Sequence, residues 1–285
     1  MINEKLIGFH DGFVDRLKLI PFERCASACL LFFCLLVLFS ATAQAADTVF
    51  LEELTWTELR DLIRSGKTTI IVPIGGTEQN GPHMALGKHN VRARALAEKI
   101  ASALGNAIVA PVIAYVPESA GHMRYPGTIT VPDDTYRKML ESAARSFKLA
   151  GIAQQHDVAK SGDYQKDNQA VAQQLDREWA ASNVRVHAVR DYYRVPTVWF
   201  AETLKGRGYS EAEIGVHAGL ADTSLMLAID PRMVRSDLMQ PAAGQKTLPG
   251  VTGDPRRASA ELGKLAVDAI VAQSVAAIRA AVASH

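Results

Sequence analysis

Cysteine is scarce in this chain of 285 residues, and all three cysteines fall in one apolar run near the start (Cys25, Cys29, Cys34). The rest of the chain therefore has no disulfide and no thiol nucleophile, and packing alone must stabilise it. An excess of charge is also lacking, because 31 Lys plus Arg against 30 Asp plus Glu give a net charge of +1. This balance excludes a basic nucleic-acid-binding surface. The hydrophobic content of 48% excludes a disordered chain.

The apolar run is typical of a targeting segment. No charge occurs between Cys25 and Ala46, Arg24 comes just before, and Ala43-Gln44-Ala45 is a small-x-small cleavage site. The apolar core at 28–39 is shorter than the roughly 20 residues that a membrane span needs. We expect a signal peptide over residues 1–45 and a mature protein, 46–285, that is periplasmic or secreted and has no stable membrane association. The alternative is an uncleaved N-terminal anchor.

Short β-branched runs alternate with helical patterns in the mature chain, which is the signature of βαβ units and a largely parallel sheet. We expect strands at 68–74, 107–116 and 184–189, with a short β run at 128–131. Helices are expected at 55–65, 90–104, 132–151, 168–181, 221–229 and 254–284. Ligands of open parallel sheets bind beyond the carboxyl ends of the strands, so the residues after each strand are the first candidates for a site.

The segment after the first predicted strand, residues 75–90, is rich in polar side chains (GGTEQNGPHMALGKHN). Asn90 is a plausible N-cap of the helix that follows. A protonated His89 beside the positive end of that helix would be disfavoured, so we expect His89 to be neutral and available as a ligand or a hydrogen-bond partner. His83 follows Pro82 and is expected only to brace the loop. Gly75-Gly76 lacks the Lys-Ser/Thr pair of a phosphate-binding loop.

Four segments carry a resemblance to a known family. GGTEQNGPH at 75–83 resembles the GSTEQHGPH signature of the creatininase (creatinine amidohydrolase) family, and three further segments match in order and spacing: GHMRYPGT at 121–128, SGDYQ at 161–165 and HAGLADTS at 217–224. The resemblance runs from about residue 50 to 235. It implies a three-layer αβα sandwich with a mainly parallel central sheet, assembled as a homo-oligomer, often a hexamer.

The resemblance also implies an activity. Members of the family use a pair of divalent metal ions to hydrolyse a non-peptide C–N amide bond, commonly in a cyclic amide. Carried over to this chain, Glu78 matches a carboxylate ligand, Asp163 stands where an acidic or amide ligand is expected, and His217 matches the histidine of proton transfer. The substrate expected from the resemblance is a small-molecule amide.

The ligand set departs from the family at three positions. Asn80 and Ser161 stand where the family has ligand histidines, and His89 stands where it has the bridging aspartate. The donors that remain are Glu78, His89 and Asp163, which suit one Zn²⁺ or Mn²⁺ better than two. We therefore expect one ion on these three residues, and the alternative is no metal. For His89 the alternative is hydrogen bonding at the helix start, and for Asp163 it is a helix cap.

The resemblance also implies which groups transfer protons. Glu78 or Asp163 is expected to act as base and His217 as acid. His122 and Arg124 lie in a turn-rich loop that could cover the site, where the guanidinium group of Arg124 could bind a substrate carboxylate in bidentate fashion. The alternative for these two residues is a surface loop with a solvated arginine.

The segment 152–160 (IAQQHDVAK) is the second departure from the family. The family pattern places a buried strand here, but this strand would bury polar side chains, at a cost of roughly 1 to 3 kcal/mol for each unpaired group. We interpret the segment as a decayed strand or as a compensated frame error in the source sequence.

Three function hypotheses follow. The first is a metal-dependent amidohydrolase. The second is a catalytically impaired family member that acts as a binding or structural oligomer, and the third is a family peptidase.

Overall fold

The computed structural model describes residues 48–160 and 164–284. The predicted signal peptide and the predicted site residue Asp163 lie outside the described residues, and both stay predictions.

Within the described residues, four parallel strands form one sheet in the order β2-β1-β3-β4. They are β1 (Thr69–Ile74), β2 (Ala107–Val109), β3 (Gln154–Ala159) and β4 (Arg185–Ala188). A helix lies between each strand and the next along the chain: α3 (Lys88–Leu104), α4 (Asp133–Leu149) and α5 (Gln165–Glu178). The predicted parallel sheet of βαβ units is confirmed.

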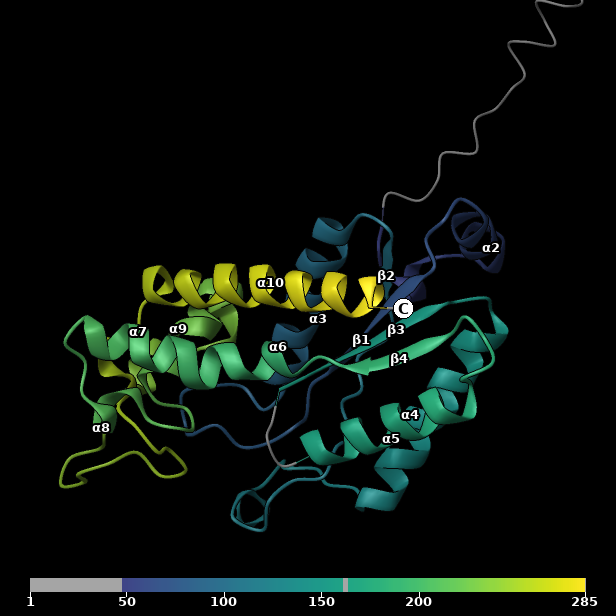
Figure 1. Cartoon of the computed structure of the whole chain (residues 1–285). Coiled ribbons are helices and arrows are strands. Elements are labelled where there is room, and N and C mark those ends of the chain that lie inside the picture. The colour runs from purple at the N-terminus through teal and green to yellow at the C-terminus, as the bar shows by residue number, and fades with distance from the viewer. Residues whose placement is uncertain (1–47, 161–163, 285) are drawn as a thin grey trace, which may run out of the picture. The chain divides into compact units, whose positions relative to one another are not determined.

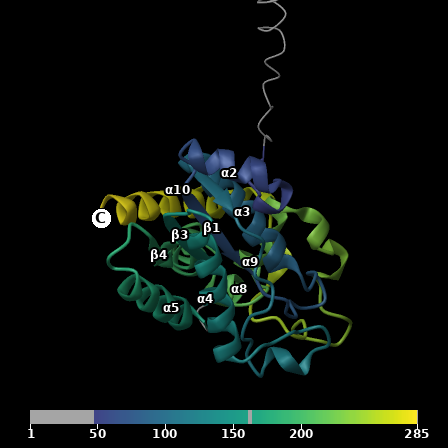
Figure 2. The same cartoon turned by 90° about the vertical axis from the view of Figure 1, so that its right-hand side faces the viewer.

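Helices cover both faces of the sheet (Figure 1). Successive residues of β1 point to opposite faces. Ile71 packs in one core with Leu96 of α3 and Ile270 of α10 (Ala260–Ala283), whereas Ile70 packs in a second core with Leu140 of α4. Figure 2 shows the same three layers from the side, with the strands between α10 and α3 above and α4 and α5 below. This is the αβα sandwich that the sequence predicts.

Several shorter elements complete the described chain. They are α2 (Trp56–Arg64), α6 (Arg190–Arg194), the π-helix η3 (Val195–Trp199), α7 (Phe200–Gly206), α8 (Glu211–Ile214), α9 (Leu220–Ile229), and the short 3₁₀ turns η1 (Leu51–Glu53), η2 (His122–Arg124), η4 (Pro231–Met233), η5 (Ser236–Leu238) and η6 (Pro255–Arg257).

By length and composition, α10 could also cross a membrane. It packs along α9 and against α3 and α6. Its apolar residues Ala266, Ile270 and Ile278 are buried there. In the described part of the chain, α10 is therefore a covering helix of the sandwich.

The polar segment at 152–160 forms a central strand. β3 pairs with β1 on one side and with β4 on the other, so its backbone is hydrogen-bonded along both edges. Gln155, His156 and Asp157 are buried, as a strand here requires. Both ring nitrogens of His156 lack a hydrogen-bond partner among the described residues. The expected polar burial is therefore present, and it does not prevent the strand from forming.

Two predicted helix starts are corrected. α3 begins at Lys88 with Gly87 as N-cap, and the side chain of Asn90 instead accepts a hydrogen bond from the backbone of Gly76 at 2.9 Å. α9 begins at Leu220, one residue before its predicted start. The second strand is also shorter than predicted, since β2 ends at Val109 and Ile113 then forms an isolated bridge with Ile74 of β1.

Candidate active site

A cavity of about 570 Å³ lies beyond the carboxyl ends of the strands. Glu78 follows β1 and Lys160 follows β3, and both line the cavity, as the rule for open parallel sheets predicts. The apolar wall comes from the segment after β4, where η3 and α7 contribute Pro196 and Phe200. π-helical turns are frequent at functional sites. Residues of α9 and the turn before it, among them His217, close the remaining side.

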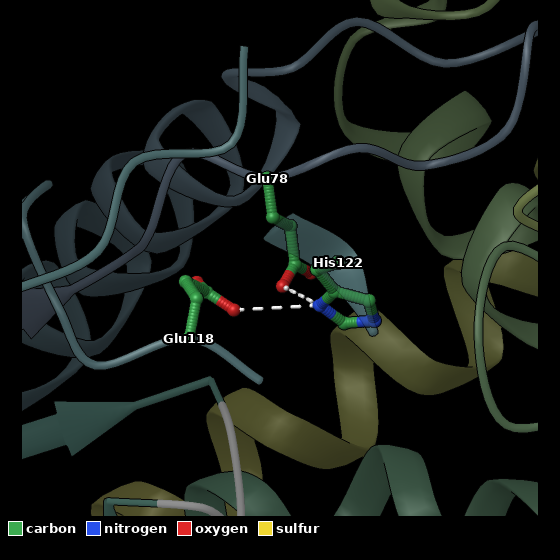
Figure 3. Close-up of side chains that lie close together, drawn as sticks. All are labelled: Glu78, Glu118 and His122. Carbon is green, nitrogen blue, oxygen red and sulfur yellow. Dashed lines mark hydrogen bonds and ion pairs between the residues drawn. The ribbon is translucent and has the colours of Figure 1, made fainter. Parts of the chain in front are cut away.

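Two carboxylates and one imidazole meet in this site. Glu78, Glu118 and His122 each offer one ligand atom, and these atoms lie within 4.8 Å of one another. The Nδ1 atom of His122 is 3.0 Å from Glu78 Oε2 and 3.5 Å from Glu118 Oε2. Figure 3 shows this nitrogen facing both carboxylates. Hydrogen bonds to Glu118 and Glu78 raise the pKa of His122 to about 9, so the ring is protonated when only protein groups surround it.

The ammonium group of Lys160 bridges the same two carboxylates. Its Nζ atom is 2.8 Å from Glu78 Oε2 and 3.1 Å from Glu118 Oε1. Burial alone would raise the pKa of Glu78, but the donors and positive charge of the surrounding His and Lys side chains outweigh it and hold that pKa well below the usual range. Burial raises the pKa of Glu118 to about 6. Glu78 is therefore the firmly ionised member of the pair.

His89 lies on the other side of Glu78. Its Nε2 atom is 2.7 Å from Glu78 Oε1, and its Nδ1 atom is 2.8 Å from Arg92. Because a guanidinium group can only donate, Nδ1 accepts and Nε2–H donates to Glu78. Burial, together with Lys160, Lys88 and Arg92, holds the pKa of His89 well below its ordinary value. The ring is neutral, as predicted, and in this arrangement it orients the carboxylate.

A buried ion-pair chain supports His89 from behind. Arg92 donates to Asp222 Oδ1 at 2.8 Å, and Lys88 pairs with the other oxygen of Asp222. Burial lowers the pKa of Lys88 to about 8, although Asp222 acts against this shift. The chain fixes α3 to the start of α9. The chain thereby also fixes His89, which donates a hydrogen bond to Glu78.

His217 stacks on His122 with ring centroids 4.4 Å apart. Its Nε2 atom is 2.9 Å from the backbone carbonyl oxygen of Gln79 and 3.1 Å from the side-chain amide nitrogen of the same residue. The carbonyl oxygen needs a donor and the amide nitrogen needs an acceptor, so Gln79 holds this ring nitrogen whichever tautomer is present. Burial and the nearby Lys88 lower the pKa of His217. The ring is therefore neutral near pH 7 and ready to accept a proton.

The structure places the other predicted residues as follows. Arg124 is exposed, with its Nε atom 3.5 Å from the carbonyl oxygen of Gly121, and it does not line the cavity. His83 is buried and hydrogen-bonded to Thr223 at 3.0 Å, which agrees with a bracing role. Asn80 donates to the carbonyl oxygen of Glu78, and its Oδ1 atom has no partner among the described residues.

Sequence reasoning missed Glu118, Lys160 and Arg92. Glu118 follows the second predicted strand after a short connection, so the strand-end rule covers it, although no motif marks it. Lys160 ends a segment whose polarity argued against a strand. Arg92 lies one helical turn after His89, and that spacing places the two side chains on the same face of α3.

The fold is a parallel αβα sandwich, and carboxylates and imidazoles surround a cavity at its strand ends. This is the architecture of a candidate metal-dependent hydrolase. The family model for creatininase, described as creatinine amidohydrolase, matches residues 52–278. The chain therefore belongs to the creatininase family.

Known relatives show the extent of the similarity. The creatinine amidohydrolase of Pseudomonas putida is 26% identical over 260 residues, which cover 82% of this chain and 97% of that protein. A mycofactocin precursor peptide peptidase of Mycolicibacterium smegmatis is 34% identical over 82 residues, or 27% of this chain and 33% of that protein. A solved creatininase in its manganese form has a TM-score of 0.64 at 25% identity, covering 82% of this chain and 98% of that chain.

Proposed function

We propose that this protein is a metal-dependent amidohydrolase that cleaves a non-peptide C–N bond in a small amide, such as a cyclic amide. The observation that carries the proposal is the convergence of Glu78, Glu118 and His122 in a creatininase-family fold, with Glu78 and His122 in the lining of the cavity. The P. putida relative and the solved creatininases support the reaction class.

The residues present fit one divalent ion. Two carboxylate oxygens and one imidazole nitrogen are hard to borderline donors, which suit Zn²⁺ or Mn²⁺, and three protein ligands leave a position open for water. The manganese form of the solved relative supports this choice of metal. We propose Glu78, Glu118 and His122 as ligands, with Asp163 as a further predicted one. A second ion would need donors at positions where this chain has Asn80 and His89.

When bound, the ion would make a water molecule acidic enough to attack and would polarise the amide carbonyl. His217 takes up the released proton and delivers it to the leaving nitrogen, and its neutral ring in the lining of the cavity supports this role. His89 holds Glu78 in one orientation. The apolar wall that η3 and α7 form would exclude water from one side of a substrate bound in the cavity.

The cavity volume of about 570 Å³ is within the range of small-molecule sites. It supports the small amide as substrate over an extended peptide. The local identity to the peptidase favours the second candidate function, hydrolysis of a peptide bond by the same site.

The test is an assay of the full-length chain, loaded with Mn²⁺ or Zn²⁺, against creatinine, related cyclic amides and short peptides. We expect turnover of a cyclic amide, with a loss of at least about 100-fold in Glu78→Gln, which keeps the side-chain shape but removes the charge. Lys166→Met, an exposed change on α5, is the matched control and should keep full activity. Turnover of peptides alone would select the peptidase. No turnover and no bound metal would select the binding or structural role.

We also propose export and assembly. Cleavage after Ala45 would place the mature chain in the periplasm or outside the cell, and a homo-oligomer, up to a hexamer, is expected from the family. N-terminal sequencing of the exported protein and its mass in solution test the two proposals. An N-terminus before residue 25 would contradict cleavage, and a monomer would contradict assembly.

A further inference from the structure

Lys160 is a buried cation inside the candidate metal site. Its side chain is 3% exposed, and the carboxylates of Glu78 and Glu118 that it bridges are 3% and 2% exposed. No other Lys or Arg side chain of the described residues forms an ion pair with either carboxylate. Two buried negative charges are thus neutralised by one ammonium group and by His122.

Lys160 and the candidate ligand His122 share an oxygen atom. Glu78 Oε2 lies 2.8 Å from Lys160 Nζ and 3.0 Å from His122 Nδ1. A divalent ion held by Glu78 and Glu118 would need carboxylate oxygens of the two residues that Lys160 now contacts. An ammonium group and a divalent ion repel each other strongly in a buried site, so both cannot hold that position together.

The backbone is shaped around this ion pair. Gly76 has a φ of +137°, and a Cβ atom there would lie 2.8 Å from Lys160 Cε and 2.8 Å from Glu118 Oε1. The backbone N–H of Lys160 donates to Ile74 at 3.3 Å, which extends the pairing of β3 with β1. The ammonium group therefore lies in a fitted position at the end of a central strand.

We propose that Lys160 is an internal cation that competes with the divalent ion for Glu78 and Glu118. It stabilises the metal-free protein, and the ion must displace it to bind. Metal loading, and with it the activity proposed above, then depends on the free metal concentration. This inference rests on the proposed metal site but not on the identity of the substrate.

The experiment compares metal binding by the full-length wild type, Lys160→Met and Lys166→Met, each stripped with EDTA and titrated with Mn²⁺ or Zn²⁺ by calorimetry. We expect Lys160→Met to bind the ion at least about 10-fold more tightly, because the competing charge is gone while the side-chain volume is kept. Lys166→Met, which changes the same residue type on the surface, should match the wild type.

Thermal unfolding of the stripped proteins gives the second readout. Without its ammonium group, Lys160→Met buries two facing carboxylates, and its Tm should fall by about 5 °C or more relative to the wild type. Saturating metal should raise the Tm of Lys160→Met by more than it raises the Tm of the wild type. Lys160→Gln, whose amide can still donate to one carboxylate, serves as a second variant if Lys160→Met does not fold.

The outcomes separate this inference from the proposed function. Equal or weaker metal binding in both Lys160 variants would overturn the competition, even if the enzyme hydrolyses amides. Tighter binding in a Lys160 variant would support it, even if no amide is cleaved. Should neither variant fold, the ¹³Cε NMR signal of Lys160 in the labelled wild type must shift on metal addition, and an unchanged signal would overturn the inference.

Discussion

The two central strands of the sheet, β1 and β3, differ in the polarity of their side chains. β1 (TIIVPI) is apolar apart from its first residue, and β3 (QQHDVA) is polar over its first four residues, yet they pair in parallel along their whole length. The register sets Ile71 beside His156 and Val72 beside Asp157. All four of these side chains are buried.

The two strands show where buried polar side chains are only tolerated by the fold and where they form part of the site. β3 gains backbone hydrogen bonds from two neighbours, and this gain does not depend on side-chain chemistry. Its middle residues remain poorly satisfied, as the lone ring nitrogens of His156 show. At the end of the strand, however, Lys160 meets two carboxylates. Polarity is thus a cost within β3 and part of the site at its carboxyl end.

The largest loss of stability is expected when β1 receives a buried carboxylate like that of β3. Val72→Asp places a carboxylate in the apolar core between β1 and α4, and we expect a loss of more than about 4 kcal/mol of unfolding free energy at pH 7. Val72→Ala, the control for lost packing, should cost about 2 kcal/mol. Urea unfolding measures both values, and equal losses would show that β1 tolerates charge as β3 does.

Neutralising Asp157 should have the next largest effect. Burial raises the pKa of Asp157 from its ordinary 3.8 to about 7. The unfolded carboxyl group ionises near pH 4 and the folded one only near pH 7, so the wild type loses stability as the pH rises across this window. Asp157→Asn does not titrate. It should match the wild type at pH 4 and exceed it by roughly 3 to 4 kcal/mol at pH 8.

Chemical unfolding of both proteins at a series of pH values measures this difference. A constant stability difference across pH 4 to 8 would refute the raised pKa.

The supporting role of His89 is tested by two replacements. His89→Ala removes the donor to Glu78, and metal affinity should fall by about 10- to 100-fold. His89→Gln can still donate to Glu78 and accept from Arg92, so it should keep most of the affinity. If His89 instead binds the ion directly, as the sequence predicts, both variants should lose metal affinity to a similar degree. Calorimetric titration with Mn²⁺ distinguishes these outcomes.

The smallest effect is expected at His156. Replacing it by leucine removes two buried nitrogens without partners, and the protein should gain about 1 kcal/mol near pH 8. Burial lowers the pKa of His156 from 6.5 to about 3, so the wild type loses stability as the pH falls below 6.5. The gain in His156→Leu should therefore be larger at pH 5. A variant less stable than the wild type at both pH values would show that the stacking on His187 outweighs the buried nitrogens.

Much of the fold could be predicted from the sequence because apolar runs and helical periodicity dominate it. β1, α3 and α4 follow such patterns, and the loop after β1 brings Glu78 to the cavity as the strand-end rule predicts. The strand β3 could not be predicted with assurance, because its formation depends on backbone pairing with β1 and β4, which side-chain polarity does not reveal.

The same limit explains the missing site residues. Lys160 enters the site only because β3 forms, and Glu118 depends on the path of an irregular loop after β2. His217 was found through the resemblance to a family, and His122 through its place in a turn-rich loop, where the sequence predicts substrate binding. Their stacking, by contrast, is a property of the folded chain.

The central claim is that Glu78, Glu118 and His122 hold one divalent ion. Elemental analysis of the full-length protein at a known concentration, after equilibration with excess Mn²⁺ or Zn²⁺ and removal of the unbound metal, tests it most directly. We predict one ion per chain in the wild type and a loss of most of it in Glu118→Gln. Two ions per chain, no ion, or full metal content in Glu118→Gln would contradict the claim.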